Sequence, residues 1–159
     1  MDLILWRHAE AEDFASSDLA RRLTPRGEQQ AARMAAWIQS QLAKLTTRSR
    51  HWHVLASPAI RAQQTAAALG MKVQTIDSIA PDASVNAILQ AADWPDNDGN
   101  VIIVGHQPTL GMVAARLLNG AEGYVSVKKG AVWWFRQRER DGESKALLVA
   151  MASPDTVAE

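Results

Sequence analysis

The sequence predicts an α/β fold with a mostly parallel sheet, helices on both faces and antiparallel strands toward the C-terminus. Two apolar runs, 3–6 and 101–104, contain no polar position and are typical of strands buried on both faces. Elsewhere, short strand-like segments alternate with segments of helical periodicity. This alternation favours strand–helix–strand units, which place parallel strands in one sheet.

After the first strand, the chain predicts a polar loop and then a long helix. The loop covers 9–20, and Thr24 and Pro25 suit the N-cap and the first helical position. Apolar residues then recur at helical spacing: Ala31, Met34, Ala35, Ile38, Leu42 and Leu45. Cations that suit the helix dipole follow near its end: Lys44, Arg48 and Arg50.

Four shorter elements continue the alternation. Residues 54–56 predict a second strand, and Pro58 suits the start of a helix over about 59–69. Residues 73–76 alternate and predict a third strand, and 85–94 predict a helix. Together they extend the parallel part of the sheet.

The last third of the chain changes character. A helix over 109–118 follows the second buried strand. Residues 131–135 and 146–151 then predict two antiparallel strands, because Asp141-Gly142 between them is a hairpin turn signal.

Two further expectations concern this region. Trp133 and Trp134 are neighbours on a strand, so we expect them to pack on opposite faces of the sheet, under the two helix layers. Beyond Ser153 and Pro154 we expect a loose tail. The sequence has no repeat, low-complexity segment or linker, which favours one domain over 1–159.

The composition excludes several classes of protein. With 47% apolar and 21% charged residues, the 159-residue chain can bury a core, and its formal net charge of zero argues against a nucleic-acid binder. It has no cysteine, which excludes disulfides and thiol catalysis. With no signal-peptide pattern and no apolar run of bilayer length, we expect a cytoplasmic protein without a membrane partner.

Two of the four histidines follow the buried strands almost directly. Arg7 and His8 end the first strand, and His106 ends the second. Because the carboxyl ends of parallel strands meet at one edge of a sheet, we expect these side chains to lie close together, with Arg61 nearby at the start of a helix. Arginine and imidazole N–H groups suit the spread negative charge of a phosphoryl group in transfer. The sequence therefore predicts phosphoryl chemistry at this edge.

The other two histidines have a plainer interpretation. His51 and His53 flank Trp52 just before the second strand, as on a half-exposed strand edge. A zinc site is not expected, because no helix carries a close histidine pair with a nearby acid and the chain has no cysteine. We expect no metal and no cofactor.

Four segments carry a resemblance to a known family. In order they read LWRHAEA at 5–11, DLARRLTPRG at 18–27, SPAIRAQQT at 57–65 and VGHQP at 104–108. They resemble the motifs of the histidine phosphatase superfamily and, within it, the short phosphohistidine phosphatases of the SixA type. The resemblance runs from residue 3 to about 118 and implies a phosphoglycerate-mutase-like fold.

The resemblance also implies a covalent, metal-independent mechanism. His8 would attack phosphorus in line, and water would then hydrolyse the phosphohistidine. A backbone carbonyl would hold the other ring nitrogen of His8, while Arg7, Arg61 and His106 would bind the phosphate oxygens. Further substrate contacts are expected from Asp18, Arg21, Ser57 and Gln107.

Two positions need separate comment. The family usually has glycine after the nucleophilic histidine, and Ala9 can replace it if its φ is negative. For a proton donor we favour Asp18, with Glu10 and Asp82 as the other candidates. Asp18 suits equally well a loop acid paired with Arg21 or Arg22.

A short chain has few residues with which to build a lid, and an open site suits a phosphorylated side chain presented by another protein. We therefore expect a protein phosphohistidine as substrate, on a histidine phosphotransfer domain or a similar carrier. The alternatives are a phosphatase of small phosphomonoesters and a module that binds phosphoproteins without turnover. Ala9 is the one feature that favours the last.

Overall fold

The computed structural model describes residues 1–45 and 51–157, so the predicted cations Arg48 and Arg50 lie outside the described residues. Its strands are β1 (Asp2–Arg7), β2 (Trp52–Ala56), β3 (Val73–Thr75), β4 (Asn100–Gly105), β5 (Val132–Arg140) and β6 (Glu143–Ala152). Its helices are α1 (Pro25–Ala43), α2 (Ile60–Ala67), the 3₁₀ turn η1 (Asp77–Ile79), α3 (Val85–Ala91) and α4 (Thr109–Asn119). The predicted alternation and fold class are confirmed.

The strands form one mixed sheet in the order β3-β2-β4-β1-β5-β6. The first four strands of this order are parallel, and β5 and β6 are antiparallel to their neighbours. In the pairing of β1 with β4, Arg7 lies opposite Gly105. Because both strands run in the same direction and end in register, His8 and His106 leave the sheet side by side.

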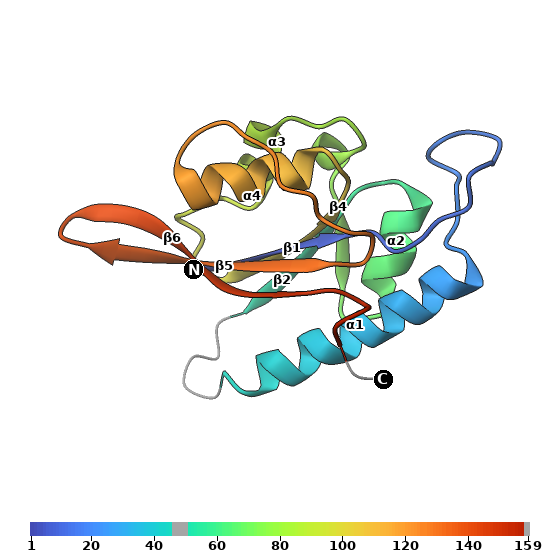
Figure 1. The fold of residues 1–159 in the computed structure, drawn as a ribbon, viewed down its shortest axis with the longest axis horizontal. Helices are drawn as coiled ribbons and strands as arrows, with labels where there is room; N and C mark the ends of the chain where they lie inside the picture. The colour runs from blue at the N-terminus through green and yellow to red at the C-terminus, as the bar shows by residue number, and fades with distance from the viewer. Residues whose placement is uncertain (46–50, 158–159) are drawn as a thin grey trace.

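Two helix layers cover the sheet, with α1 and α2 on one face and α3 and α4 on the other (Figure 1). Alternate residues of β1 supply both cores: Ile4 packs with Met34 of α1, and Leu5 packs in the cluster that contains Leu110 of α4. As predicted, Trp134 belongs to the first cluster, whereas Trp133 packs against the second.

The start of α1 forms as the sequence predicts. Thr24 is the N-cap, and its hydroxyl accepts a hydrogen bond of 2.9 Å from the Gly27 amide. Pro25 occupies the first turn. This cap fixes the end of the loop that crosses the carboxyl edge of the sheet.

The C-terminal region differs from the prediction in two ways. Both hairpin strands are longer than expected, and the hairpin extends beyond the rest of the sheet to a turn at Asp141-Gly142, where both φ angles are positive (Figure 1). The charged residues of this extension have no buried face, so no hydrophobic pattern reveals them. The predicted loose tail beyond Pro154 is wrong for 155–157, since the Thr156 amide donates to the Ser153 carbonyl at 3.0 Å and Val157 packs against the first core cluster.

Within the described ranges, no helix has the length and apolar character needed to cross a bilayer.

Candidate functional site

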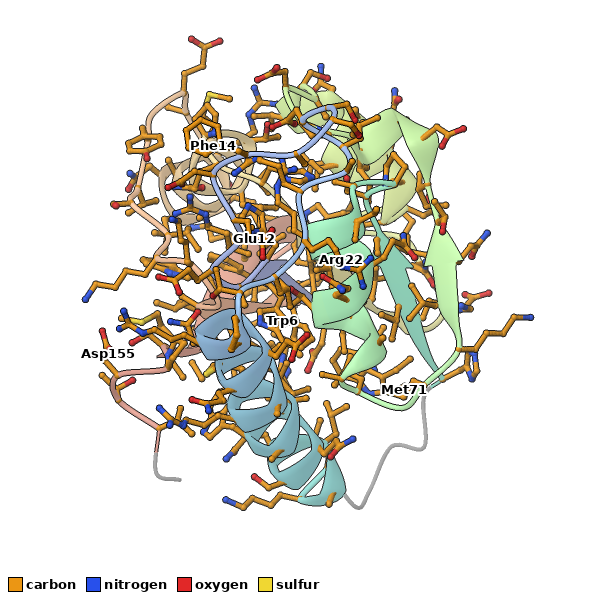
Figure 2. The ribbon with its side chains drawn as sticks, turned by 90° about the vertical axis from the view of Figure 1, so that its right-hand side faces the viewer. Trp6, Glu12, Phe14, Arg22, Met71 and Asp155 are labelled. Carbon is orange, nitrogen blue, oxygen red and sulfur yellow. The ribbon has the colours of Figure 1, made fainter. Side chains whose placement is uncertain are left out.

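A cleft of about 280 Å³ opens at the carboxyl ends of β1, β2 and β4, the end of the molecule that faces the viewer in Figure 2. Of the eight predicted site residues, all except Ser57 line it. Its described lining consists of Arg7, His8, Ala11, Asp18, Arg21, Arg61, Pro81, Asp82, His106, Gln107 and Lys129. The lining thus brings together residues from five separate parts of the sequence.

His8 is only 6% exposed at the base of this cleft. Its Nδ1 lies 2.8 Å from the Ala9 carbonyl, so Nδ1–H donates there and Nε2 keeps its lone pair. Burial lowers the pKa of His8 to about 3, against the raising effect of that carbonyl. At neutral pH the ring is therefore a neutral imidazole with one basic nitrogen.

The His106 ring lies beside His8, with 5.2 Å between the ring centroids. Its Nε2 is 2.7 Å from the Ser57 hydroxyl, and its Nδ1 is 3.4 Å from Nη2 of Arg61. Because a guanidinium can only donate, Nδ1 is the acceptor and Nε2–H faces the hydroxyl. Burial and, after it, the Arg61 charge lower the pKa of His106 to about 4.

Ser57 is expected to contact substrate, but the structure gives it another place. Its side chain is fully buried and does not line the cleft. Its hydroxyl accepts from the Ala59 amide at 3.1 Å and holds His106 at the same time. The hydroxyl thus turns inward to the Ala59 amide and the His106 ring, where it orients the imidazole.

Two arginines approach the cleft from opposite sides, and both are tied to loop backbone. Arg61 is 3% exposed and donates to the Asp18 carbonyl at 2.7 Å, and Arg7 donates to the Val127 carbonyl at 2.8 Å. Burial also lowers the pKa of Arg7. Among the described residues, the buried side-chain polar atoms without a hydrogen-bond partner are Nε of Arg7 and Nε of Arg61. Buried N–H donors are rarely left unpaired, so this pair indicates an anion that completes them.

The three candidate proton donors have different surroundings. Glu10 does not line the cleft, and its carboxylate accepts from the Thr24 hydroxyl at 2.7 Å. The Asp18 carboxylate binds Arg21 and Arg61, each at 3.1 Å. Burial raises the pKa of Asp18, but both arginines lower it more, so the net pKa lies below its usual value. Asp18 thus has the ion pair with Arg21 that a loop acid would have, and Asp82 lines the cleft.

Gln107 lines the cleft, but its amide is occupied. Nε2 donates to the Tyr124 hydroxyl at 3.0 Å and to the Val125 carbonyl, and Oε1 accepts from the Gly111 amide at 2.7 Å. This side chain therefore fastens the loop after α4 to the cleft. That loop adds Lys129 to the lining, a residue with no signal in the sequence pattern.

Ala9 lies in a conformation that alanine adopts easily. It is not among the residues with positive φ, it is fully buried, and its methyl group packs with Leu23 and Ala31. Its amide donates to the Thr65 hydroxyl at 3.0 Å. Sequence reasoning missed Thr65, although its position four residues after Arg61 puts both on one helix face.

Three comparisons bear on this site. The family model of the histidine phosphatase superfamily (branch 1) matches residues 3–84, more than half of the chain. Among curated proteins, a phosphohistidine phosphatase SixA homolog of Haemophilus influenzae is 29% identical and covers 97% of each chain. The phosphohistidine phosphatase SixA of Escherichia coli strain K12 is 30% identical and covers 76% of each chain.

The fold has a solved counterpart as well. A structure of the protein histidine phosphatase SixA complexed with tungstate has a TM-score of 0.78 and 24% identity, over 98% of each chain. The resemblance in fold therefore extends through the C-terminal hairpin, beyond the part that the family model matches.

Proposed function

The chain belongs to the histidine phosphatase superfamily, and from this premise we propose that it is a phosphatase that hydrolyses phosphohistidine on a partner protein, with His8 as the nucleophile. One observation carries the proposal: a neutral imidazole with a free Nε2 lies in the same cleft as two buried, unpaired arginine N–H donors. This is what attack on an anionic phosphoryl group requires.

In the first step, Nε2 of His8 attacks phosphorus as the bond from phosphorus to the partner's imidazole breaks. The proton on Nδ1 stays with the Ala9 carbonyl, which stabilises the cationic ring that forms. In the second step, water attacks phosphorus, the bond to His8 breaks, and inorganic phosphate leaves. In this two-step route the phosphoryl group first passes from the partner's imidazole to the His8 imidazole, two groups of similar basicity.

The arginines and His106 stabilise the charge on the equatorial oxygens. Nη1 of Arg7 and Nη1 of Arg61 are already fixed on backbone carbonyls, so both guanidinium groups are held at the cleft before an anion binds. A bound phosphoryl group raises the pKa of His106, whose Nδ1 then takes a proton and donates to an oxygen. Ser57 keeps this ring in place.

The leaving group determines how much acid catalysis the site needs. A departing imidazole can carry its own proton, whereas an alkoxide needs one delivered. Asp18, which its two arginines keep ionised, is poorly suited to deliver it, and Asp82 is the other acid in the cleft lining. The site therefore favours phosphoramidate over phosphoester substrates.

The test is phosphate release from a histidine-phosphorylated phosphotransfer domain in EDTA, by the wild type and by His8→Ala. Release by the wild type alone supports a metal-independent phosphohistidine phosphatase. Binding without release by either favours the phosphoprotein-binding module. A rate on an aryl phosphate that equals or exceeds the rate on phosphoramidate favours the small phosphomonoesterase instead.

A further inference from the structure

Large apolar side chains lie exposed on the loops that border the cleft. Phe14 is 88% exposed, Tyr124 is 58% exposed and Leu19 is 46% exposed. A phenylalanine so fully in water gains nothing from its ring in the folded monomer. Aromatic side chains of this kind, next to a charged pocket, are typical of surfaces that contact another protein.

The loop that carries Phe14 and Leu19 is held in place. Its base is closed by the bridge between Ala11 and Leu23 and by the bond from the Glu12 amide to the Arg22 carbonyl, 2.8 Å long. Figure 2 shows it at the end of the molecule that faces the viewer, with Glu12 and Phe14 on one limb and Arg22 on the other.

The same loop is bound directly to the phosphoryl-binding machinery. Arg61 holds Asp18 through both its carbonyl and its carboxylate, and the Ile60 amide at the start of α2 donates to the Leu19 carbonyl at 2.9 Å. Leu19 therefore sits next to a residue that lines the cleft. A protein that contacts this loop also lies over the cleft.

Tyr124 belongs to the loop after α4, which borders the cleft separately. Its hydroxyl accepts from Gln107, a lining residue. The same loop supplies the Val127 carbonyl that holds Arg7. Both loops thus combine an exposed apolar side chain with a direct bond to one of the two arginines.

We propose that Phe14, Leu19 and Tyr124 form a docking rim that binds the surface of a folded protein around its phosphohistidine. This inference rests on the proposed function. The groups that meet the phosphoryl group are buried, so a phosphorylated side chain must enter from a surface that touches the rim. The arginines of the cleft can bind any phosphoryl group, whereas the apolar rim adds contacts that only a protein substrate makes.

A second set of exposed apolar residues provides the control. Leu147, Leu148 and Met151 lie on β6, and none of them lines the cleft. If exposed apolar area in general contributed to binding of the protein substrate, substitutions on β6 and on the rim would have equal effects. A docking rim predicts an effect at the rim residues and none at these residues of β6.

The experiment compares two substrates that share one scissile bond: a histidine-phosphorylated phosphotransfer domain and free N-phosphohistidine. Phe14→Ala should raise KM for the domain about tenfold and leave kcat/KM for the free amino acid within about twofold, since Phe14 lies outside the cleft. Leu19→Ala should act in the same direction. Leu147→Ala should change neither substrate.

Every other outcome overturns either the docking rim or the proposed function. Equal losses on both substrates would mean that Phe14 supports the cleft itself, and no loss on the domain would mean that the rim does not dock it; both overturn the docking rim. Hydrolysis of the free amino acid alone by the wild type overturns docking of a protein substrate. Hydrolysis of neither by the wild type overturns the proposed function, and the rim with it.

Discussion

Two pairs of histidines lie close together in this protein, and their surroundings differ. The ring centroids are 5.2 Å apart for His8 and His106 and 4.6 Å apart for His51 and His53. The first pair is buried at the carboxyl ends of β1 and β4. The second pair is exposed at the amino end of β2.

The second pair borders the larger hollow, of about 700 Å³, whose described lining includes Lys72 and no arginine. The first borders the smaller cleft, which contains three arginines. Neither closeness of imidazoles nor the size of a hollow therefore indicates chemistry here. Burial, which keeps the rings neutral, and guanidinium donors, which bind an anion, make the difference.

The sharpest way to break this comparison is to remove one ring from each pair. His8→Ala should lower kcat/KM for a phosphohistidine protein by more than about a thousandfold, because no other group takes the phosphoryl. His53→Ala should leave it within about twofold. Steady-state phosphate release measures both, and similar losses in the two variants would contradict the distinction.

A guanidinium is needed at Arg61, and a charge alone is insufficient. Arg61→Lys should lower kcat/KM about a hundredfold, because an ammonium cannot hold Asp18 and donate to the phosphoryl group together. The matched control is Arg22→Lys, an exposed arginine of the loop that carries Asp18, outside the cleft lining. Full activity of Arg61→Lys would show that net charge suffices.

We expect Asp18 to act on the reaction through Arg61, which binds its carbonyl and its carboxylate. Asp18→Asn should lower kcat/KM about tenfold, and the shape of the pH–rate profile should not change, because the carboxylate is already ionised. Asp13→Asn, an exposed acid of the same loop, should have no effect. Disappearance of an alkaline limb in Asp18→Asn would instead identify Asp18 as the proton donor.

The pH dependence of activity and of stability should reflect the lowered pKa values of His8 and His106. Since the pKa values of His8 and His106 are about 3 and 4, kcat/KM should show no inflection of the free enzyme near pH 6.5. Between pH 6.5 and 4 the unfolded chain binds more protons than the folded chain. The free energy of unfolding therefore decreases as the pH is lowered from 6.5 to 4, by up to about 1.4 kcal/mol per pH unit for each histidine.

Urea unfolding at several pH values measures this loss. His8→Asn should make the free energy of unfolding less dependent on pH. Equal slopes in the wild type and His8→Asn would contradict the depressed pKa of His8.

The smallest effect is expected at Ala9. Because its φ is negative and its methyl group is packed, Ala9→Gly should destabilise the fold by about 0.5–1 kcal/mol and leave the rate within about twofold. Thermal unfolding and phosphate release measure the two effects. A large gain in rate would mean that the methyl group obstructs the phosphoryl group.

The sequence was sufficient to predict which residues meet at the edge of the sheet. Apolar runs define β1 and β4, and two parallel strands that end in register bring His8 and His106 together. The roles of Ser57 and Gln107 depend on which way each polar side chain turns. That direction follows from hydrogen bonds to nearby backbone and loop groups, which no sequence pattern reveals. Likewise, the charged part of the β5–β6 hairpin and the packed segment 153–157 carry no periodic signal.

The most direct measurement is the site of the covalent intermediate. The protein is mixed with a phosphotransfer domain that carries radioactive phosphohistidine, quenched rapidly in alkali, which preserves phosphohistidine, and mapped by peptide digestion. We predict label on His8 and on no other histidine, and none in His8→Ala. Label on His106, His51 or His53 would contradict the assignment of His8 as the nucleophile.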